Sequence, residues 1–359
     1  MSWTHVAPAQ EIHFGTGVVD RVGEVLRRVG ARDTLVVTSP SAFGTEAARR
    51  LERALGHGLT TCFSEVEPQA PASAVQAAFL QARRDGVDSV VSLGGGSCAD
   101  VAKAVCFFSE QEAGTPAVAV GDRPALPHVA VPTTYVGAAV SPSFWMTEPA
   151  TGQARGGSSP TLAPVAVLAD PEAVQETPAD IRVTTAVTAL AQAVEVAIHP
   201  AATPEAAATA QAGGNRILHS IRSVASDPSD QEAGSAVLEG AVLAARALAP
   251  DIGLVTLGLA RLLAGRSGAA HRTLVAVLLP PVLRRVPPAA ARELGRALGV
   301  DDVADAVAEL ASDLALPSSL SECEVGPGDI EATTRLAQSD PAFGGMDEDD
   351  LRSLLDDAA

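Results

Sequence analysis

The sequence has little positive charge, few cysteines and no long apolar run. It carries 25 Lys and Arg residues against 43 Asp and Glu residues, for a net charge of −18 at pH 7. Nucleic acids and anionic membranes repel such a chain, so we expect neither as a partner. No stretch approaches the run of about 20 apolar residues that spans a membrane. The first residues, "MSWTHVAPAQEIHFG", lack the basic and apolar regions of a signal peptide. We therefore expect a cytoplasmic protein that acts on a small molecule.

Common catalytic and metal-binding motifs are also missing. The four cysteines show no CxxC spacing, which predicts reduced thiols rather than a metal site (Cys62, Cys98, Cys106 and Cys323). The chain contains no HExxH, no GxSxG, no GxGxxG and no Walker loop ending in GK[ST]. These absences exclude the zinc proteases of the HExxH type, the usual serine hydrolases and the P-loop nucleotidases.

The pattern along the chain predicts two domains. Up to about residue 170, short β-branched runs alternate with helical segments such as 46–56, which predicts βαβ units and a parallel sheet. Beyond that point the periodicity is helical only, with helices over 236–248, 272–283 and 304–314. We expect an α/β domain over 1–170 and an all-α domain over 171–359. The predicted strands lie within 33–40, 89–97, 127–134 and 164–171.

The stretch "SLGGGSCADVAKAV" (92–105) is the strongest local signal. A buried strand ends in Gly94, Gly95 and Gly96, and a helix begins directly after them. Glycines let backbone N–H groups approach a phosphate, and a helix N-terminus favours negative charge. Ser97 is expected to cap this helix and to donate to a phosphate oxygen. The alternative is a tight strand-to-helix turn without a ligand.

A second polar segment, "VAVPTTYVGAAVSP" (129–142), follows the next predicted strand. It brings Thr133, Thr134 and the single tyrosine, Tyr135, to the carboxyl end of that strand. Open α/β sheets bind their ligands at that edge. Without the neighbouring glycine loop, a threonine-rich turn would be the better explanation of the segment.

Two polar side chains interrupt the apolar helix predicted over 184–199. Thr188 and Gln192 are four residues apart and therefore lie on one helix face. A third polar residue, His271, lies in a Gly/Ala-rich turn before another apolar helix. The simplest interpretation is structural: a threonine bonded to its own helix, a glutamine reaching water at an edge, and a histidine satisfied in the core. The alternative is a polar site.

These segments, in this order, resemble the iron-containing (group III) alcohol dehydrogenases, and most closely their maleylacetate reductase branch. "FGTG" (14–17) resembles the family's opening strand turn, and "GGGSCADVAKA" resembles its GGGSxxDxAKA loop. "VPTTYVGAAVSP" is similar to the reductases' PTTYAGSEMTP, and "VLADP" matches VxxDP at the domain junction. The resemblance implies a dehydroquinate synthase-like architecture: a Rossmann-like dinucleotide-binding domain, a helical domain and an active-site cleft between them.

The same resemblance shows which metal ligands are missing. Metal-dependent members hold Fe²⁺ or Zn²⁺ with one Asp and three His. Thr188 stands at the Asp position, Gln192 at the first His position, and Leu257 and Arg261 align with an HxxxH segment. Only the last histidine is kept, as His271. One ligand of four cannot hold a divalent cation, so we expect no metal.

The resemblance implies an NAD or NADP cofactor on Gly94, Gly95, Gly96, Ser97 and Asp100, with Thr133 and Thr134 nearby. Ser39 ends the first strand, where many members have an Asp that favours NAD, so the choice of cofactor stays open. Arg155 aligns loosely with a basic residue expected before the VxxDP strand.

The favoured hypothesis is a metal-independent NAD(P)-dependent reductase, expected to be a homodimer. His271 would protonate the developing alkoxide, Arg261 or Arg266 would bind a substrate carboxylate, and three polar groups would bond the carbonyl (Thr188, Gln192 and Tyr135). Two alternatives stay open. One is a non-redox enzyme on this scaffold, such as a dehydratase, cyclase or isomerase, and the other is a catalytically silent partner subunit.

Overall fold

The computed structural model describes residues 3–4, 7–114, 124–249, 252–338, 340, 343 and 345–359. The chain forms two compact units. The first, here called the sheet unit, comprises Val6–Ala150 and Arg155–Pro178. The second, the helical unit, comprises Met1–His5, Thr151–Ala154 and Ala179–Ala359.

The division between the units falls later than the sequence predicted. The chain passes into the helical unit after Pro178 and not at residue 170. The short helix α6 (Pro171–Gln175) packs against α3 and β5 of the sheet unit. In the same segment, the Thr177 hydroxyl donates to the Thr133 carbonyl at 2.7 Å. These contacts keep the segment with the sheet, although its sequence is already helical.

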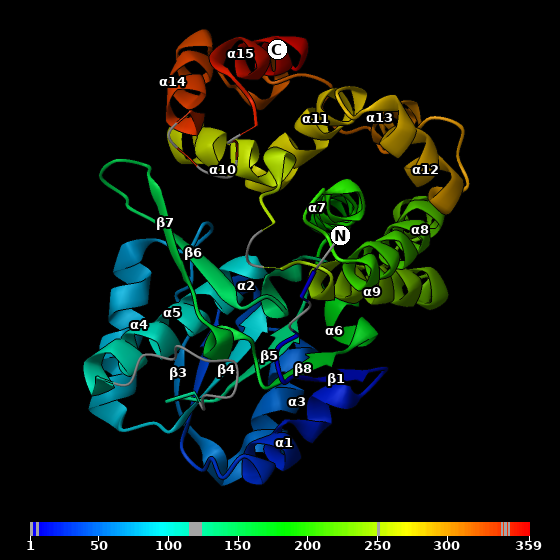
Figure 1. Cartoon of the computed structure of the whole chain (residues 1–359). Coiled ribbons are helices and arrows are strands. Elements are labelled where there is room, and N and C mark those ends of the chain that lie inside the picture. Colours follow the sequence, from blue (N-terminus) through cyan, green and yellow to red (C-terminus); the bar gives the residue numbers. More distant parts are fainter. Residues whose placement is uncertain are drawn as a thin grey trace. The chain divides into compact units, whose positions relative to one another are not determined.

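The sheet unit is built on six parallel strands in the order β1-β8-β5-β4-β2-β3 (Figure 1). The four predicted strands are the central ones, and all four are fully buried. The two edge strands, β1 and β3, are partly exposed and carry a weaker apolar pattern, so periodicity alone did not predict them. The periodicity also missed a separate β6–β7 pair. The strands are β1 (Glu11–Phe14), β2 (Thr34–Thr38), β3 (Leu59–Phe63), β4 (Ser89–Gly94), β5 (His128–Pro132), β6 (Ser143–Thr147), β7 (Ala154–Ser158) and β8 (Ala166–Ala169).

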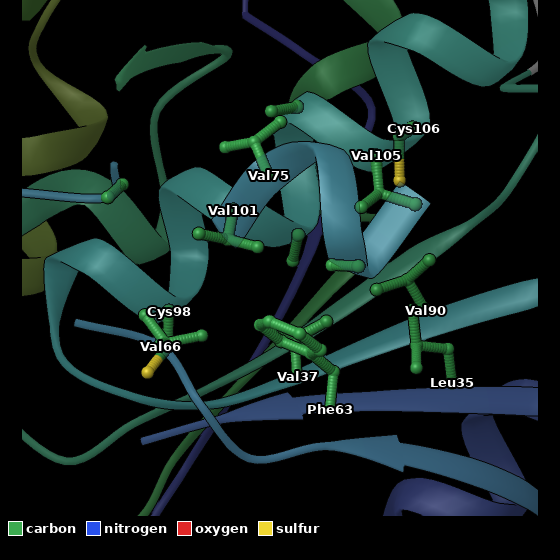
Figure 2. Packing of buried hydrophobic residues seen from close by; sticks show 14 of the residues in the cluster. Leu35, Val37, Phe63, Val66, Val75, Val90, Cys98, Val101, Val105 and Cys106 are labelled. Atoms are coloured by element: carbon green, nitrogen blue, oxygen red, sulfur yellow. The ribbon is translucent and has the colours of Figure 1, made fainter. Parts of the chain in front are cut away.

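Helices cover both faces of this sheet, because side chains alternate between the faces along each strand. Leu35 and Val37 join a core with α4 and α5, whereas Val36 joins a core with α1 and α3. Figure 2 shows Val101 and Val105 of α5 packed above Leu35, Val37 and Val90 of the sheet. The helices of this unit are α1 (Val22–Arg28), α2 (Pro40–Phe43), α3 (Glu46–Leu55), α4 (Ala72–Asp85), α5 (Gly96–Ala113) and α6. Its short 3-10 turns are η1 (Val18–Arg21), η2 (Gly56–Gly58), η3 (Gly137–Ala139) and η4 (Pro160–Leu162).

The helical unit is organised around α7 (Ala179–Ile198). By length and composition α7 could cross a membrane, but 83% of its most apolar window is buried inside the protein. It packs against α8, α9, α10, α11 and α12, as the core helix of a globular unit does. No strand follows β8 in the described part of the chain, as the periodicity predicted. The remaining elements are α8 (Pro204–Ser226), α9 (Gln231–Arg246), α10 (Val255–Ser267), α11 (His271–Arg284), α12 (Pro288–Leu298), α13 (Val303–Asp313), η5 (Ser321–Cys323), α14 (Pro327–Ala337) and α15 (Glu348–Asp357).

Candidate functional site

The glycine loop lies between β4 and the 18-residue helix α5. Gly94 has φ +148°, a backbone conformation that side chains other than glycine rarely adopt. A Cβ placed on Gly95 would lie 3.2 Å from Cγ2 of Thr134, and one on Gly96 would lie 3.3 Å from Cγ2 of Val136. A side chain at Gly95 or Gly96 would therefore press against the segment that holds Thr134 and Val136. The unbonded N–H groups in the first turn of a helix attract an anion.

Thr134 supplies a polar group beside this loop. Its side chain is buried, and its Oγ1 has no hydrogen-bond partner within the described residues. The neighbouring Thr133 is held by its backbone, because its N–H donates to the Gly94 carbonyl at 3.0 Å. A buried hydroxyl without a partner is costly unless a ligand or water meets it. The glycine loop and Thr134 together fit the phosphates of a dinucleotide.

Three predicted cofactor residues have structural contacts that the sequence did not show. Ser97 does not cap α5: Gly95 is the N-cap, and the Ser97 hydroxyl accepts from the Gln69 N–H at 3.0 Å. That bond leaves the hydroxyl proton of Ser97 available to donate. Asp100 forms an ion pair with Lys103 at 3.3 Å. Ser39 caps α2 by accepting from the backbone N–H of Ala42 at 3.3 Å.

Lys103, the single lysine, forms hydrogen bonds with the segment that follows Thr134. Its side chain is fully buried and donates to the carbonyls of Ala138, at 2.9 Å, and Ser143. Burial lowers the pKa of Lys103, and the nearby Asp100 carboxylate opposes that shift. Tyr135, in the same segment, is only 1% exposed. Sequence analysis placed Lys103 in the loop motif without assigning it a role; a lone lysine in an apolar helical run was the available signal.

The two polar residues of α7 that the sequence singled out, Thr188 and Gln192, both form hydrogen bonds inside the helical unit. The Thr188 hydroxyl donates to the Thr184 carbonyl of its own helix at 3.0 Å, as the structural interpretation predicted. Gln192 does not reach water at an edge: it is buried, and its Nε2 donates to the Ala244 carbonyl of α9 at 3.2 Å. A buried amide needs such a partner, which only the packing of α9 on α7 supplies.

His271 differs from its prediction in two respects. It is the first residue of α11 rather than part of the preceding turn. Its Nε2 lies 3.2 Å from the carbonyl oxygen of Leu257 on α10. Burial lowers the pKa of His271 to about 4, and the positive charge of Arg261 adds to the shift. The ring is therefore neutral at pH 7, whereas the hypothesis that His271 protonates the alkoxide needs a ring that titrates near neutrality.

The candidate arginines lie in different surroundings. Arg261 is partly buried on α10, one turn after Leu257. Arg266, on the same helix, is more exposed and lies 4.0 Å from a carboxylate oxygen of Asp329. Arg155 is exposed on β7 of the hairpin. The positive charge of Arg261 contributes to the lowered pKa of His271, whereas Arg266 has Asp329 as an acidic neighbour.

Glu195 is a polar residue of α7 that the sequence analysis did not single out. Both of its carboxylate oxygens accept from the Thr256 N–H, each at 3.2 Å, in the first turn of α10. Burial raises the pKa of Glu195 to about 7, and its hydrogen bonds to Thr256 limit the rise. A carboxylate one turn beyond Gln192 in a long apolar run was the signal that could have indicated it.

The residues at the family's metal positions do not fit a metal ion. Thr188 and Gln192 are engaged with carbonyl groups, Leu257 has no side-chain donor, and the Nε2 of His271 faces a carbonyl oxygen. Hard and borderline divalent cations need carboxylate, imidazole or thiolate ligands, and these positions supply one imidazole. Within the described residues, no group of three or more His, Cys, Asp or Glu side chains is placed to hold a metal.

Comparison with known proteins identifies the family. The model of the iron-containing alcohol dehydrogenases matches residues 9–171, and the model of the C-terminal part of Fe-containing alcohol dehydrogenases matches residues 182–358. The chain is 32% identical over 365 residues to maleylacetate reductase from Pseudomonas knackmussii, covering all of this chain and 98% of the relative. Against maleylacetate reductase from a Rhizobium species it is 30% identical over 353 residues, covering 97% and 95%.

Solved structures show the same similarity in three dimensions. Maleylacetate reductase from Agrobacterium tumefaciens superposes with a TM-score of 0.85 at 27% identity, covering 100% of this chain and 98% of that one. A putative alcohol dehydrogenase from Ralstonia eutropha gives a TM-score of 0.87 at 28% identity with the same coverage. The chain belongs to the iron-containing alcohol dehydrogenase family, and it is an NAD(P)-dependent oxidoreductase. The predicted fold, a parallel-sheet domain followed by a helical domain, is confirmed.

Proposed function

We propose that this protein is a metal-independent reductase that uses NADH or NADPH to reduce a carbonyl or enone group of a small carboxylated substrate. The observation that carries the proposal is the state of the metal positions: two are hydrogen-bonded to backbone carbonyls, one is an apolar leucine and one is a neutral histidine. The relatives are named maleylacetate reductases, which favours an unsaturated oxo acid as substrate.

The sheet unit contains the residues that would hold the cofactor. Gly94, Gly95 and Gly96 leave room for a pyrophosphate at the start of α5, and Ser97 and Thr134 each offer a hydroxyl to it. A bound nicotinamide supplies the hydride. Because Ser39 brings no carboxylate to the end of β2, we propose no preference between NAD and NADP.

The oligomeric state, the location and the binding partners of the protein are also proposals. We expect a homodimer in solution, a cytoplasmic location, and no binding of nucleic acid or membranes, since the net charge is −18. Light scattering coupled to size exclusion would report a mass of two chains, and a mass of one chain of 36.3 kDa would contradict the dimer.

The test combines metal analysis with turnover. Purified protein is assayed for iron and zinc, then mixed with NADH or NADPH and maleylacetate, and the loss of nicotinamide absorbance is followed with and without a chelator. We expect substoichiometric metal and a rate that the chelator leaves unchanged. One metal per chain, lost together with activity on chelation, would contradict metal independence.

Nucleotide binding without turnover over a panel of oxo acids and quinone-like carbonyls would favour the non-redox alternative. A protein that binds no nucleotide would favour a silent partner subunit.

A further inference from the structure

The segment that follows β5 lies against the glycine loop. A Cβ on Gly95 would lie 3.2 Å from Cγ2 of Thr134, so the two chain segments are in close contact there. The start of the segment is fixed at the loop, because the Thr133 N–H donates to the Gly94 carbonyl at 3.0 Å. The position of this segment, residues 133–143, here called the cover segment, therefore sets the room beside the glycines and the direction of the Thr134 hydroxyl.

Lys103 of α5 binds the other end of the cover segment. Its Nζ donates to the carbonyl of Ala138 at 2.9 Å and to the carbonyl of Ser143. The Ser141 hydroxyl accepts a longer bond from the same atom, at 3.4 Å. Helix α5 also packs against η3 and β6, which contain Ala138 and Ser143. The cover segment is thus fixed at its start by the glycine loop and at its end by one ammonium group.

Lys103 is not placed to bind a phosphate itself. It follows Gly96, the first residue of α5, by seven residues, which is about two turns or roughly 10 Å along the helix axis. Its side chain is fully buried, and its ammonium group also forms an ion pair with Asp100 at 3.3 Å. These contacts, with those to the cover segment, use the donors of the ammonium group inside the protein. Any effect of Lys103 on a ligand is therefore exerted through the segment that it holds.

Thr134 is the residue of the cover segment through which such an effect would reach a ligand. Its Oγ1 is buried and has no hydrogen-bond partner in the part of the chain that the structure describes. A hydroxyl strengthens binding when it is already directed at the ligand, because ordering a loose segment on binding costs free energy. Without Lys103, the carbonyls of Ala138 and Ser143 would lose their donor and the cover segment would be held at one end only.

We propose that Lys103 is a positioning residue for the dinucleotide: it fixes the cover segment so that the Thr134 hydroxyl donates to a phosphate oxygen at the glycine loop. This inference rests on the proposed function, which places the dinucleotide phosphates at that loop. Lys103 makes and breaks no bond in the reaction. Asp100, which the sequence analysis grouped with the cofactor residues, belongs to this arrangement through its ion pair with Lys103.

The experiment is a double-mutant cycle on NADH affinity, measured by fluorescence titration. Lys103→Met is nearly as long as lysine but has no N–H donor, and Thr134→Val removes the hydroxyl without shortening the side chain. We expect each variant to lower the affinity by roughly 10–100-fold, the usual effect of losing a hydrogen bond to a charged group. The double variant should be little weaker than the weaker single variant, because Lys103 acts through Thr134.

Turnover gives a second readout that a loss of stability alone would not produce. With maleylacetate as substrate, Lys103→Met should raise the KM for NADH and leave kcat at saturating NADH unchanged, since the bond to the phosphate is present throughout the reaction. Ser109→Ala is the control on the same helix. It removes a hydroxyl that donates to the Val105 carbonyl of α5 at 2.8 Å, and it should change neither KM nor kcat.

A second variant keeps the test decisive if Lys103→Met does not fold at the assay temperature. Lys103→Gln buries no charge and keeps an amide donor on a side chain that is one bond shorter. It should show a smaller loss of NADH affinity, with the same dependence on Thr134.

Three outcomes would overturn the proposal. They are an unchanged NADH affinity in a folded variant of Lys103 or Thr134, losses that add in the double variant, and a fall in kcat at saturating NADH. Additive losses would mean that Lys103 contributes to binding independently of Thr134. Wild-type protein that binds no NADH would refute the proposed function itself, and this inference with it. The two failures are distinguishable, because in the first three outcomes the wild type binds NADH.

Discussion

The glycine loop of the sheet unit and the core of the helical unit have departed from the family pattern to very different degrees. The loop between β4 and α5 keeps its three glycines: the backbone of Gly94 disfavours a Cβ, and a Cβ on Gly95 or Gly96 would make a tight contact. In the helical unit the helices are present, but Thr188, Gln192 and Leu257 occupy positions where metal-dependent members have ligands.

The difference arises because the two kinds of site depend on different parts of the chain: a phosphate site on the backbone, and a metal site on side chains. A phosphate site made of backbone N–H groups is lost if almost any side chain is added, so its sequence is tightly constrained. A metal site depends on a few side chains, and replacing them with buried residues that satisfy their own hydrogen bonds leaves the helix packing intact. The chemistry of one unit can therefore change while the other stays the same.

The largest expected effect concerns the glycine loop of the sheet unit. Gly95→Val adds a branched side chain whose Cβ alone would lie 3.2 Å from Thr134. We expect dinucleotide affinity to fall by at least roughly 100-fold, which corresponds to about 2.7 kcal/mol. Fluorescence titration with NADH measures it. Gly58→Ala, whose Cβ makes only an ordinary contact, is the matched control. Unchanged affinity in Gly95→Val would remove the phosphates from this loop.

The second prediction concerns a variant in which the missing metal ligands of the helical unit are restored. Thr188→Asp and Gln192→His on α7, combined with Leu257→His on α10, restore three ligands in addition to His271 of α11. We expect this variant to bind about one zinc per chain, as a site with one carboxylate and three imidazoles should. Wild type should bind none. Metal analysis after gel filtration compares the two proteins, with Thr188→Asp alone as the control. Stoichiometric metal in the wild type would refute the prediction.

The third prediction concerns the pH dependence of stability in the helical unit. Glu195 has a pKa of about 7 in the folded protein, against 4.5 as its ordinary value. The folded state therefore binds its proton more tightly, and this group lowers the free energy of unfolding as pH rises from about 4.5 to about 7. The loss approaches about 3 kcal/mol.

Glu195→Gln cannot lose this proton. Its unfolding free energy relative to wild type should therefore rise between pH 5 and pH 8. Urea titrations at pH 5, 6.5 and 8 measure the difference, and Glu309→Gln, an exposed residue of α13, should show no such trend. A difference between Glu195→Gln and wild type that is constant with pH would show that Glu195 is ionised throughout.

The smallest expected effect concerns His271. Because its pKa is about 4, the ring carries no proton to donate as an imidazolium at pH 7. His271→Asn should therefore lower turnover by less than about tenfold, or about 1.4 kcal/mol. The pH profile of wild-type kcat should show no break near pH 6.5. A break there that disappears in the variant would restore His271 as the general acid.

The sequence predicted the four central strands because each is fully buried, and a fully buried strand is a continuous run of apolar residues. Such a run is easily recognised in a sequence. The sequence analysis missed β1, β3, β6 and β7, which are partly exposed, so their apolar pattern is weak. The candidate residues Thr188, Gln192, Arg261 and His271 were also found from the sequence. Their roles were not, because a role depends on which carbonyl or charge lies opposite each side chain.

By itself the sequence determined the backbone features of this protein: the parallel sheet, the glycine loop at the start of α5 and the apolar helix α7. These depend on periodicity and on residues without side chains, which are local properties. Only the tertiary structure decided that Gln192 bonds to Ala244, that Glu195 binds the first turn of α10, and that His271 is neutral. Each of these results arises from burial and from partners far away in the chain. Burial and distant partners cannot be predicted from a residue's neighbours in the sequence.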